Sequence, residues 1–284
     1  MLKISSLFIF LPSCLQFTPI ITPIPLDPIS QEEFAKLDYR VMHHAYQCQN
    51  QLGRLCDEVI YQNDLAARLQ SIGLGPVRTG VRITVTHRDF TKHYSLDLMV
   101  ADAGIYELKT AHKLVGEHDA QLLNYLFLYG SFRGKLINFR PPKVESRFVN
   151  TTLAPQQRHE FEVDTRRWQE REESDHLFRT TLLGLLEDWG SWLELALYTE
   201  AITHFIGGPG RGLQLVPLQR EGISLGNQHL HLLSPETAFR LTALPEVPEE
   251  YEYQLRSLLG LSPLRTMQWV NFAHHCVEFI TLRR

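Results

Sequence analysis

The chain has 284 residues, of which 44% are hydrophobic and 21% are charged, and its formal net charge is −4. At roughly 100–200 residues per domain, this length allows one large domain or two ordinary ones. The composition excludes disordered, collagen-like and disulfide-framework proteins. The near-neutral total also argues against a nucleic-acid-binding protein, unless charge is segregated along the chain.

The first 30 residues differ from the rest. Residues 1–17 resemble the apolar region of a signal peptide but offer no clear cleavage site, and the Pro-rich residues 21–30 are typical of an extended linker. We therefore expect residues 1–30 to be a disordered leader and linker, of which the leader is dispensable, and the sequence leaves open whether residues 1–25 are a genuine part of the protein. No later run of about 18 apolar residues predicts a membrane span. The four cysteines form no CxxC pair, so reduced thiols in a cytoplasmic protein are expected.

The first half of the chain predicts an α/β arrangement with a mixed sheet. A capping-box pattern at Ser30 opens a helical pattern that runs to about residue 72, with breaks near Gly53 and Gly73. Strand-like runs follow at 81–88, 93–100 and 105–110, with turn residues at 101–104. A helix over 117–130 and strands over 134–139 and 146–153 complete this half.

The second half repeats the same order of elements. It predicts a helix over 180–205, a second helix over 251–260, and strands at 213–219, 227–233, 236–244, 267–272 and 275–282. Similar residues recur 133 positions apart, as in Gln121 and Gln254, and in Asn138 and Asn271. We therefore predict an internal duplication, with one domain over residues 31–155 and a degenerate copy over residues 156–284.

Asp97, Glu107 and Lys109 form the candidate chemical site. Glu107 and Lys109 are two residues apart on one strand, so they share a face. If the preceding turn centres on Asp102, paired residue numbers sum to about 204, and Asp97 faces Glu107. Opposed carboxylates need a cation. With the backbone carbonyl of Leu108 they form an oxygen site suited to Mg²⁺ or Mn²⁺, and Lys109 would position water or stabilise phosphate charge. The alternative is an ordinary hairpin with three surface charges.

The spacing of Asp97, Glu107 and Lys109, followed by the helix sequence HDAQLLNYL and the strand KLINF, resembles the PD-(D/E)XK nuclease superfamily. More narrowly, the stretch QLGRLCDEVIYQNDLA is similar to the GxxExxY-type nucleases, with Glu58 and Tyr61 at the motif's Glu and Tyr, although Leu55 replaces its Gly. The resemblance covers residues 38–153. It implies a restriction-endonuclease-like α-β-β-β-α-β core, a divalent metal, phosphodiester hydrolysis, and Glu58 and Gln121 as accessory catalytic residues.

Several of these residues also have ordinary structural interpretations. Glu58 could be a solvated helix charge, and Gln121 could bond the backbone near the start of its helix. Tyr61 is expected to pack between helix and sheet. His112 and His118 could contact phosphate, but exposed loop histidines are the default expectation.

The second copy lacks the carboxylate pair. One alignment places His231, Arg240 and Thr242 at the three site positions, and Glu194 near the position of Glu58. We therefore expect this copy to bind no metal in the same way and to serve packing, dimerisation or substrate contact. The two halves could form a pseudo-dimer within one chain, and the oligomeric state stays open.

Charge is indeed segregated along the chain. Residues 71–153 contain 11 Lys and Arg against 7 Asp and Glu, a net charge of +4, although the whole chain carries −4. This permits phosphate binding. The leading hypothesis is a metal-dependent nuclease acting on DNA, with RNA less favoured. The alternatives are an inactive nucleic-acid-binding or scaffold protein that keeps the fold and, with less support, a small-molecule metallohydrolase.

Overall fold

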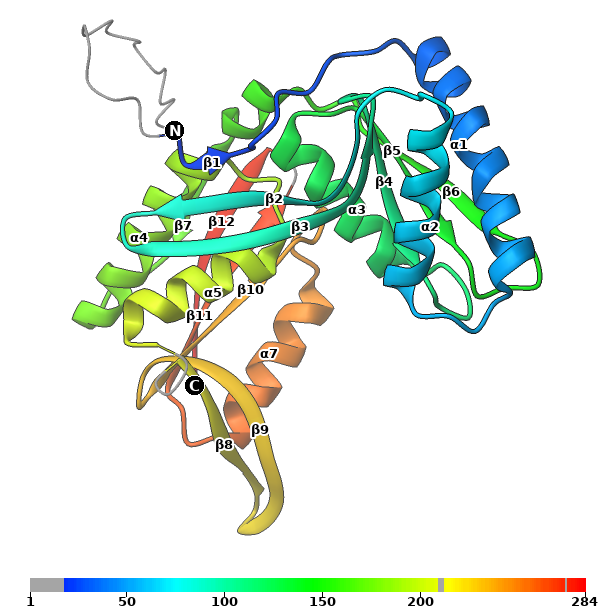
Figure 1. Ribbon diagram of the computed structural model, residues 1–284. Coiled ribbons are helices and arrows are strands. Elements are labelled where there is room, and N and C mark those ends of the chain that lie inside the picture. The colour runs from blue at the N-terminus through cyan, green and yellow to red at the C-terminus, as the bar shows by residue number, and fades with distance from the viewer. Residues whose placement is uncertain (1–17, 209–211, 274) are drawn as a thin grey trace, which may run out of the picture. The chain divides into compact units, whose positions relative to one another are not determined.

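A computed structural model describes residues 18–208, 212–273 and 275–284 (Figure 1). The described chain divides into two compact units, an N-terminal unit from Thr18 to Pro155 and a C-terminal unit from Gln156 to Arg284. The expected leader lies outside the described residues up to position 17. Within the described part of the chain, no helix is long and apolar enough to cross a membrane.

The N-terminal unit is a six-stranded mixed sheet with helices on both faces (Figure 1). The strands run in the order β1-β2-β3-β4-β5-β6, and only β4 and β5 pair in parallel. This confirms the predicted mixed α/β fold. The strands are β1 (Ile20–Ile21), β2 (Val77–His87), β3 (Phe90–Val100), β4 (Gly104–Lys109), β5 (Arg133–Asn138) and β6 (Glu145–Asn150), and the helices are α1 (Gln31–Leu52), α2 (Glu58–Ser71) and α3 (Gly116–Tyr129).

Residues 18–30 are part of this unit, so the expectation of a disordered linker is wrong for them. Ile20 and Ile21 form β1, which pairs with β2. The backbone N–H of Asp27 donates to the carbonyl of Asp102 at 2.8 Å. Ile29 packs against the core, and Ser30 caps α1 through the predicted capping box with Glu33. The Pro-rich stretch therefore covers the sheet rather than separating two bodies.

The core of the N-terminal unit lies between the sheet and the first two helices. One face of the sheet presents Leu98, Tyr106, Leu108, Ile137 and Phe139 to buried residues of α1 and α2. The other face carries α3, and a Cβ added to Gly134 on β5 would lie 3.0 Å from the Leu122 side chain. Because side chains alternate along a strand, Asp97, Glu107 and Lys109 project to the side that α3 covers.

The C-terminal unit has its own six-stranded mixed sheet, in the order β7-β12-β11-β10-β9-β8. Its elements include the strand β7, which was not predicted, and two helices in place of the single helix predicted over 180–205. Gly190, with φ 78°, ends the first of them because a left-handed backbone favours glycine. The elements are the 3₁₀ turn η1 (Pro155–His159), β7 (Glu162–Arg167), α4 (Glu173–Trp189), α5 (Leu195–Ile206), β8 (Leu213–Arg220), β9 (Ile223–Ser234), β10 (Thr237–Thr242), α7 (Glu249–Leu261), β11 (Thr266–Ala273) and β12 (Cys276–Arg283).

The two units share one topology after their first strands, which differ, because β1 pairs antiparallel with β2 whereas β7 pairs in parallel with β12. Each has two helices, an antiparallel hairpin, a third strand, a helix, a strand parallel to that third strand, and a final antiparallel strand. The register also matches at the offset of 133, because Glu107 pairs with Leu136 as Arg240 pairs with Trp269. The offset is 137 in the first two helices, since Gly53 and Gly190 occupy equivalent helix ends.

Three side-chain contacts recur at equivalent positions. Tyr61 and Tyr198 donate from their hydroxyls to the carbonyls of Gly53 and Gly190, at 2.8 and 2.6 Å. Each tyrosine also packs on an equivalent phenylalanine, with ring centroids 4.5 and 5.1 Å apart. The third contact is made by a buried asparagine.

That asparagine bridges the sheet to the loop after the third strand. Asn138 accepts from the N–H of Ala111 at 3.0 Å and donates to its carbonyl at 2.8 Å. Asn271 makes the same two bonds with Leu244, at 2.9 and 3.1 Å. Both asparagines are fully buried.

We predict that Asn138→Ala destabilises the protein by about 1–3 kcal/mol, because it leaves a buried N–H and carbonyl without partners. Chemical denaturation followed by circular dichroism measures the effect. Asn150→Ala, which removes an exposed asparagine at the end of β6, is the control and should change stability little. Equal stability of the two variants would contradict the structural role of the bridge.

Candidate functional site

The site lies where β3 and β4 separate. The ladder between them pairs Leu98 with Tyr106, and Met99 with Ile105, so paired residue numbers sum to 204 as the sequence predicts. Asp97 and Glu107 occupy the next position, just beyond the last pair of the ladder. With the ladder ended, the Leu108 N–H donates to Asp97 Oδ2 at 2.8 Å instead of to a backbone carbonyl. The Asp97 carboxylate thus accepts the hydrogen bond that a backbone carbonyl of β3 would accept in a continued ladder.

Glu107 and Lys109 form a buried ion pair. Lys109 Nζ lies 2.7 Å from Glu107 Oε1, and the two side chains are only 13% and 2% exposed. The second Glu107 oxygen, Oε2, is buried and accepts no hydrogen bond within the described residues. One carboxylate oxygen in the interior therefore lacks a compensating positive group.

The local electrostatics disfavour negative charge at this site. Burial, followed by repulsion from Asp97, raises the pKa of Glu107 from 4.5 to about 8. Burial also raises the pKa of Asp97, although the Leu108 N–H opposes this shift. Burial alone would lower the pKa of Lys109, but the surrounding carboxylates raise it above its ordinary value. The lysine is therefore a cation. Its single positive charge does not fully compensate the carboxylates, because the pKa of Glu107 stays raised.

Glu58 joins this cluster from α2. It is the first residue of that helix, and burial raises its pKa, while Lys109 opposes the shift and Asp97 adds to it. The Thr110 backbone also lowers the pKa of Glu58 and so opposes the effect of burial. One turn further along α2, Gln62 Nε2 donates to the Asp97 backbone carbonyl at 2.6 Å. The structure thus brings Glu58 together with the residues of β3 and β4.

Gln121 does not share this arrangement. It lies on α3, and its amide donates to the Tyr125 hydroxyl one turn along the same helix at 3.1 Å. Within the described residues it has no hydrogen bond to either carboxylate. His118 is also accounted for locally, since its ring accepts the Val115 N–H at the start of α3, and His112 is an exposed loop residue. Tyr61 packs between helix and sheet, as expected.

Two residues near the site are not among the predicted ones. Gln62 lies four residues after Glu58, so the helical period alone could have placed it on the same face. Arg140 follows β5 and donates from Nε to the Thr110 carbonyl at 3.2 Å, next to Lys109. No sequence signal identifies Arg140, because its partners lie about 30 and 85 residues away along the chain.

The residues present fit a divalent metal of the Mg²⁺ type. Asp97, Glu107 and the carbonyl of Leu108 offer hard oxygen ligands, and the orphaned Glu107 Oε2 provides an unused one. The Leu108 carbonyl lies on the same side of β4 as its N–H, which is directed at Asp97. Among the described residues no three His, Cys, Asp or Glu side chains converge as a metal site. A closed, all-protein cage is therefore absent there, and Mg²⁺ usually retains several waters.

The equivalent positions of the C-terminal unit hold no carboxylate. The shared register places Leu230 at the position of Asp97, so the predicted equivalence of His231 was one residue off. Arg240 and Thr242 stand at the positions of Glu107 and Lys109, as predicted. Glu194 precedes the first residue of α5 and corresponds to Asp57, whereas Leu195 takes the position of Glu58.

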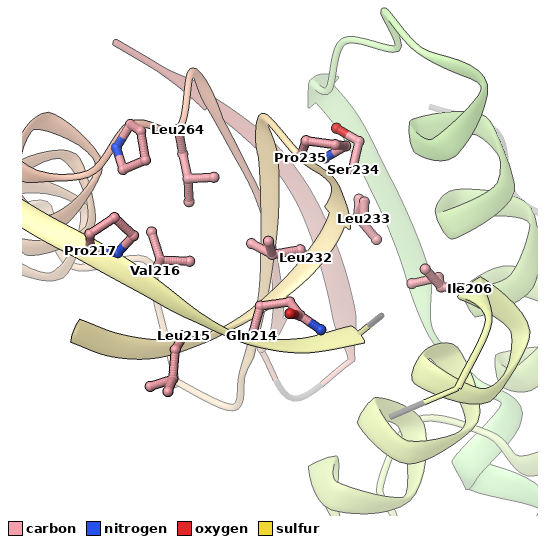
Figure 2. A pocket seen from close by; sticks show the side chains of 11 residues that line it. Ile206, Gln214, Leu215, Val216, Pro217, Leu232, Leu233, Ser234, Pro235 and Leu264 are labelled. Carbon is pink, nitrogen blue, oxygen red and sulfur yellow. The ribbon is translucent and has the colours of Figure 1, made fainter. Parts of the chain in front are cut away.

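The C-terminal unit also contains a cavity of about 650 Å³ (Figure 2). Its walls come from the β8–β9 hairpin, the end of α5 and the loop before β11. They are mostly apolar, and none of them is titratable: Ile206, Gln214, Leu215, Val216, Pro217, Leu232, Leu233, Ser234, Pro235, Pro263 and Leu264. The cavity therefore offers no acid, base or metal ligand.

The N-terminal unit is thus a mixed α/β domain with opposed carboxylates and a lysine on the central strands of its sheet. Residues 35–149 match the family model described as the PD-(D/E)XK nuclease superfamily, so this part of the chain is a domain of that superfamily, which generally comprises nucleases. The narrower GxxExxY resemblance stays a prediction.

Two further comparisons add little. No curated protein matches the sequence. One similar solved structure, "Crystal structure of SSO0001", is 17% identical with a TM-score of 0.26, and the match covers 45% of this chain and 63% of that chain. A likeness of this size carries no argument about function.

We predict that Glu107→Gln stabilises the metal-free protein at pH 8. In the unfolded chain this carboxyl ionises near pH 4.5, whereas in the fold it does so near 8. Stability is therefore lost as pH rises from about 4.5 to about 8, on the order of a few kcal/mol. Thermal unfolding in a chelator across this range should show a smaller pH slope in the variant.

Glu117→Gln, at an exposed position on α3, is the control and should leave the pH slope of the wild type unchanged. A Glu107→Gln variant that is less stable than the wild type at pH 8 would show that this carboxylate contributes to the fold rather than opposing it.

Proposed function

We propose that the N-terminal unit is a divalent-metal-dependent nuclease that hydrolyses phosphodiester bonds of DNA, with RNA as the alternative substrate. The observation that carries this proposal is the half-buried Asp97 and the buried Glu107 beside Lys109, in a domain of a superfamily of nucleases. Opposed buried carboxylates weaken a fold, so a site that keeps them indicates a use for them. The net charge of +4 over residues 71–153 supports an anionic substrate.

In this proposal the residues of the site divide the work of metal binding and of stabilising the reacting phosphate. Asp97, Glu107 and the Leu108 carbonyl hold Mg²⁺ or Mn²⁺, which when bound would polarise the phosphoryl group and lower the pKa of its water. Lys109 Nζ orients the attacking water or stabilises negative charge on the phosphate. Glu58 stands near Lys109, where its charge favours the protonated lysine. Gln121 keeps only the accessory role that the family resemblance suggests.

We further propose that the C-terminal unit is a degenerate second copy. The identical element order, the constant register and the recurring tyrosine and asparagine contacts support a duplication. Leucine, arginine and threonine at the three site positions support the loss of metal binding. Such a unit would serve packing, dimerisation or substrate contact.

We predict that Lys109→Ala lowers nuclease activity by ~100-fold or more, because it removes the cation beside the reacting phosphate. Purified protein is assayed with Mg²⁺ or Mn²⁺ on single-stranded, duplex and flap DNA and on RNA. Lys113→Ala removes an exposed lysine four residues away and should keep the activity. Cutting that persists in Lys109→Ala would point to contamination or another site.

We predict that Mn²⁺ raises the thermal stability of the wild type and not that of Asp97→Asn. A ligand at 100 times its dissociation constant stabilises a fold by ~2.7 kcal/mol. Arg240→Ala changes the position in the C-terminal unit that corresponds to Glu107, and it should keep the full shift. A metal shift without nuclease activity on any substrate would favour the alternative, a nucleic-acid-binding protein that retains the fold and the site.

A further inference from the structure

Arg140 connects two segments that meet at the site. Its guanidinium donates to three backbone carbonyls: from Nε to Thr110 at 3.2 Å, from Nη1 to Arg54 at 2.6 Å, and from Nη2 to Cys56 at 3.4 Å. Thr110 directly follows Lys109 at the end of β4. Arg54 and Cys56 belong to the short loop between α1 and α2, which ends immediately before Glu58.

Gln49 reinforces this connection from α1. Its buried amide nitrogen donates to the carbonyls of Phe139 and Pro141, at 2.8 and 2.9 Å, on either side of Arg140. The segment that carries Arg140 is thereby held against the end of α1. In turn Arg140 holds the loop that α1 leads into, so the loop is fixed at both ends.

The helix that carries Glu58 has little local support at its start. Its N-cap residue, Asp57, makes no side-chain cap hydrogen bond. The preceding loop is irregular, and its residues Arg54 and Leu55 are exposed. The carbonyls of this loop are instead satisfied by side chains from outside it, by Tyr61 at Gly53 and by Arg140 at Arg54 and Cys56.

The C-terminal unit shows which of these contacts the fold needs. It keeps the tyrosine–glycine bond, the tyrosine–phenylalanine contact and the asparagine bridge. At the positions of Arg140 and Gln49, however, it has Ala273 and Leu186, at offsets of 133 and 137. An equivalent loop thus forms without these two residues, in the unit that has no carboxylate site.

We propose that Arg140, supported by Gln49, is a positioning residue that sets the loop 53–57 and thereby places Glu58, the first residue of α2, near Lys109. The inference rests on the proposed nuclease function for its kinetic consequence only. Its structural consequence, a loop held by the guanidinium, can be measured whether or not the protein cuts nucleic acid. A guanidinium suits this role because its planar fork donates from three separate nitrogens to three separate carbonyls, whereas an ammonium donates from a single nitrogen.

The first experiment is amide hydrogen exchange on the metal-free full chain. Arg140→Ala should speed exchange across residues 54–61 by tenfold or more and leave β4 and β5 protected, and Arg140→Lys should fall between it and the wild type. The control, Arg78→Ala, removes an arginine that bonds only Asp102 by its side chain and should leave this segment unchanged. Unchanged exchange in Arg140→Ala would overturn the proposal.

The second experiment separates positioning from phosphate contact. Arg140→Ala should lower kcat at least tenfold with KM within about twofold, and in a Glu58→Gln background it should lower kcat no further, because it acts through Glu58. A raised KM with unchanged kcat, or fully additive effects, would show direct substrate contact and overturn the proposal. A wild type that cuts nothing, together with accelerated exchange in Arg140→Ala, would reject the nuclease function. The role of Arg140 in holding the loop 53–57 would still stand.

Discussion

The opposition of Asp97 and Glu107 across β3 and β4 is the constraint on which the rest of the site depends. Burial raises the pKa of both carboxyls, repulsion from Asp97 raises the pKa of Glu107 further, and Lys109 offsets only part of these shifts. The sheet tolerates the pair because the ladder ends there, and the Leu108 N–H bonds Asp97 instead of a strand. A local loss of pairing thus creates both the strain and the oxygen cluster that can receive a cation.

The two units separate what builds the fold from what builds the site. The contacts that recur are those that satisfy buried backbone groups or fill the core: the hydroxyl of Tyr61 on Gly53, and the amide of Asn138 on its loop. They stabilise the sheet and helices irrespective of chemistry. The groups that do not recur are Asp97, Glu107 and Lys109, together with Arg140, whose bonds hold the loop before Glu58. The contacts found in both units stabilise the fold, whereas those found only in the N-terminal unit belong to the candidate site.

The sequence predicts the parts of this structure that depend on short separations. Alternating side chains and the tight turn at 101–104 are enough to place Asp97 opposite Glu107, one step beyond the last observed pair of the β3–β4 ladder. The pairing of Ile20 with Val85 and the bonds of Arg140 to residues some 85 positions away have no local signal. The break at Gly190 is hidden for another reason. Apolar residues continue through the loop 190–194, so hydrophobic periodicity alone extends the helix across it.

In the degenerate copy that we propose, the replacements at the three site positions remove the carboxylates and keep the fold. Arginine at the position of Glu107 substitutes a positive charge for a metal ligand, which by itself opposes cation binding. Arg240 is exposed and its guanidinium lies 3.4 Å from a tyrosine hydroxyl, so it avoids the cost of burial. Thr242 then bonds both Asn271 and Trp269, at 2.7 and 2.8 Å, which satisfies polar groups in the core. Without a bound cation, an exposed arginine and uncharged residues that pair with their neighbours make a more stable sheet than opposed carboxylates do.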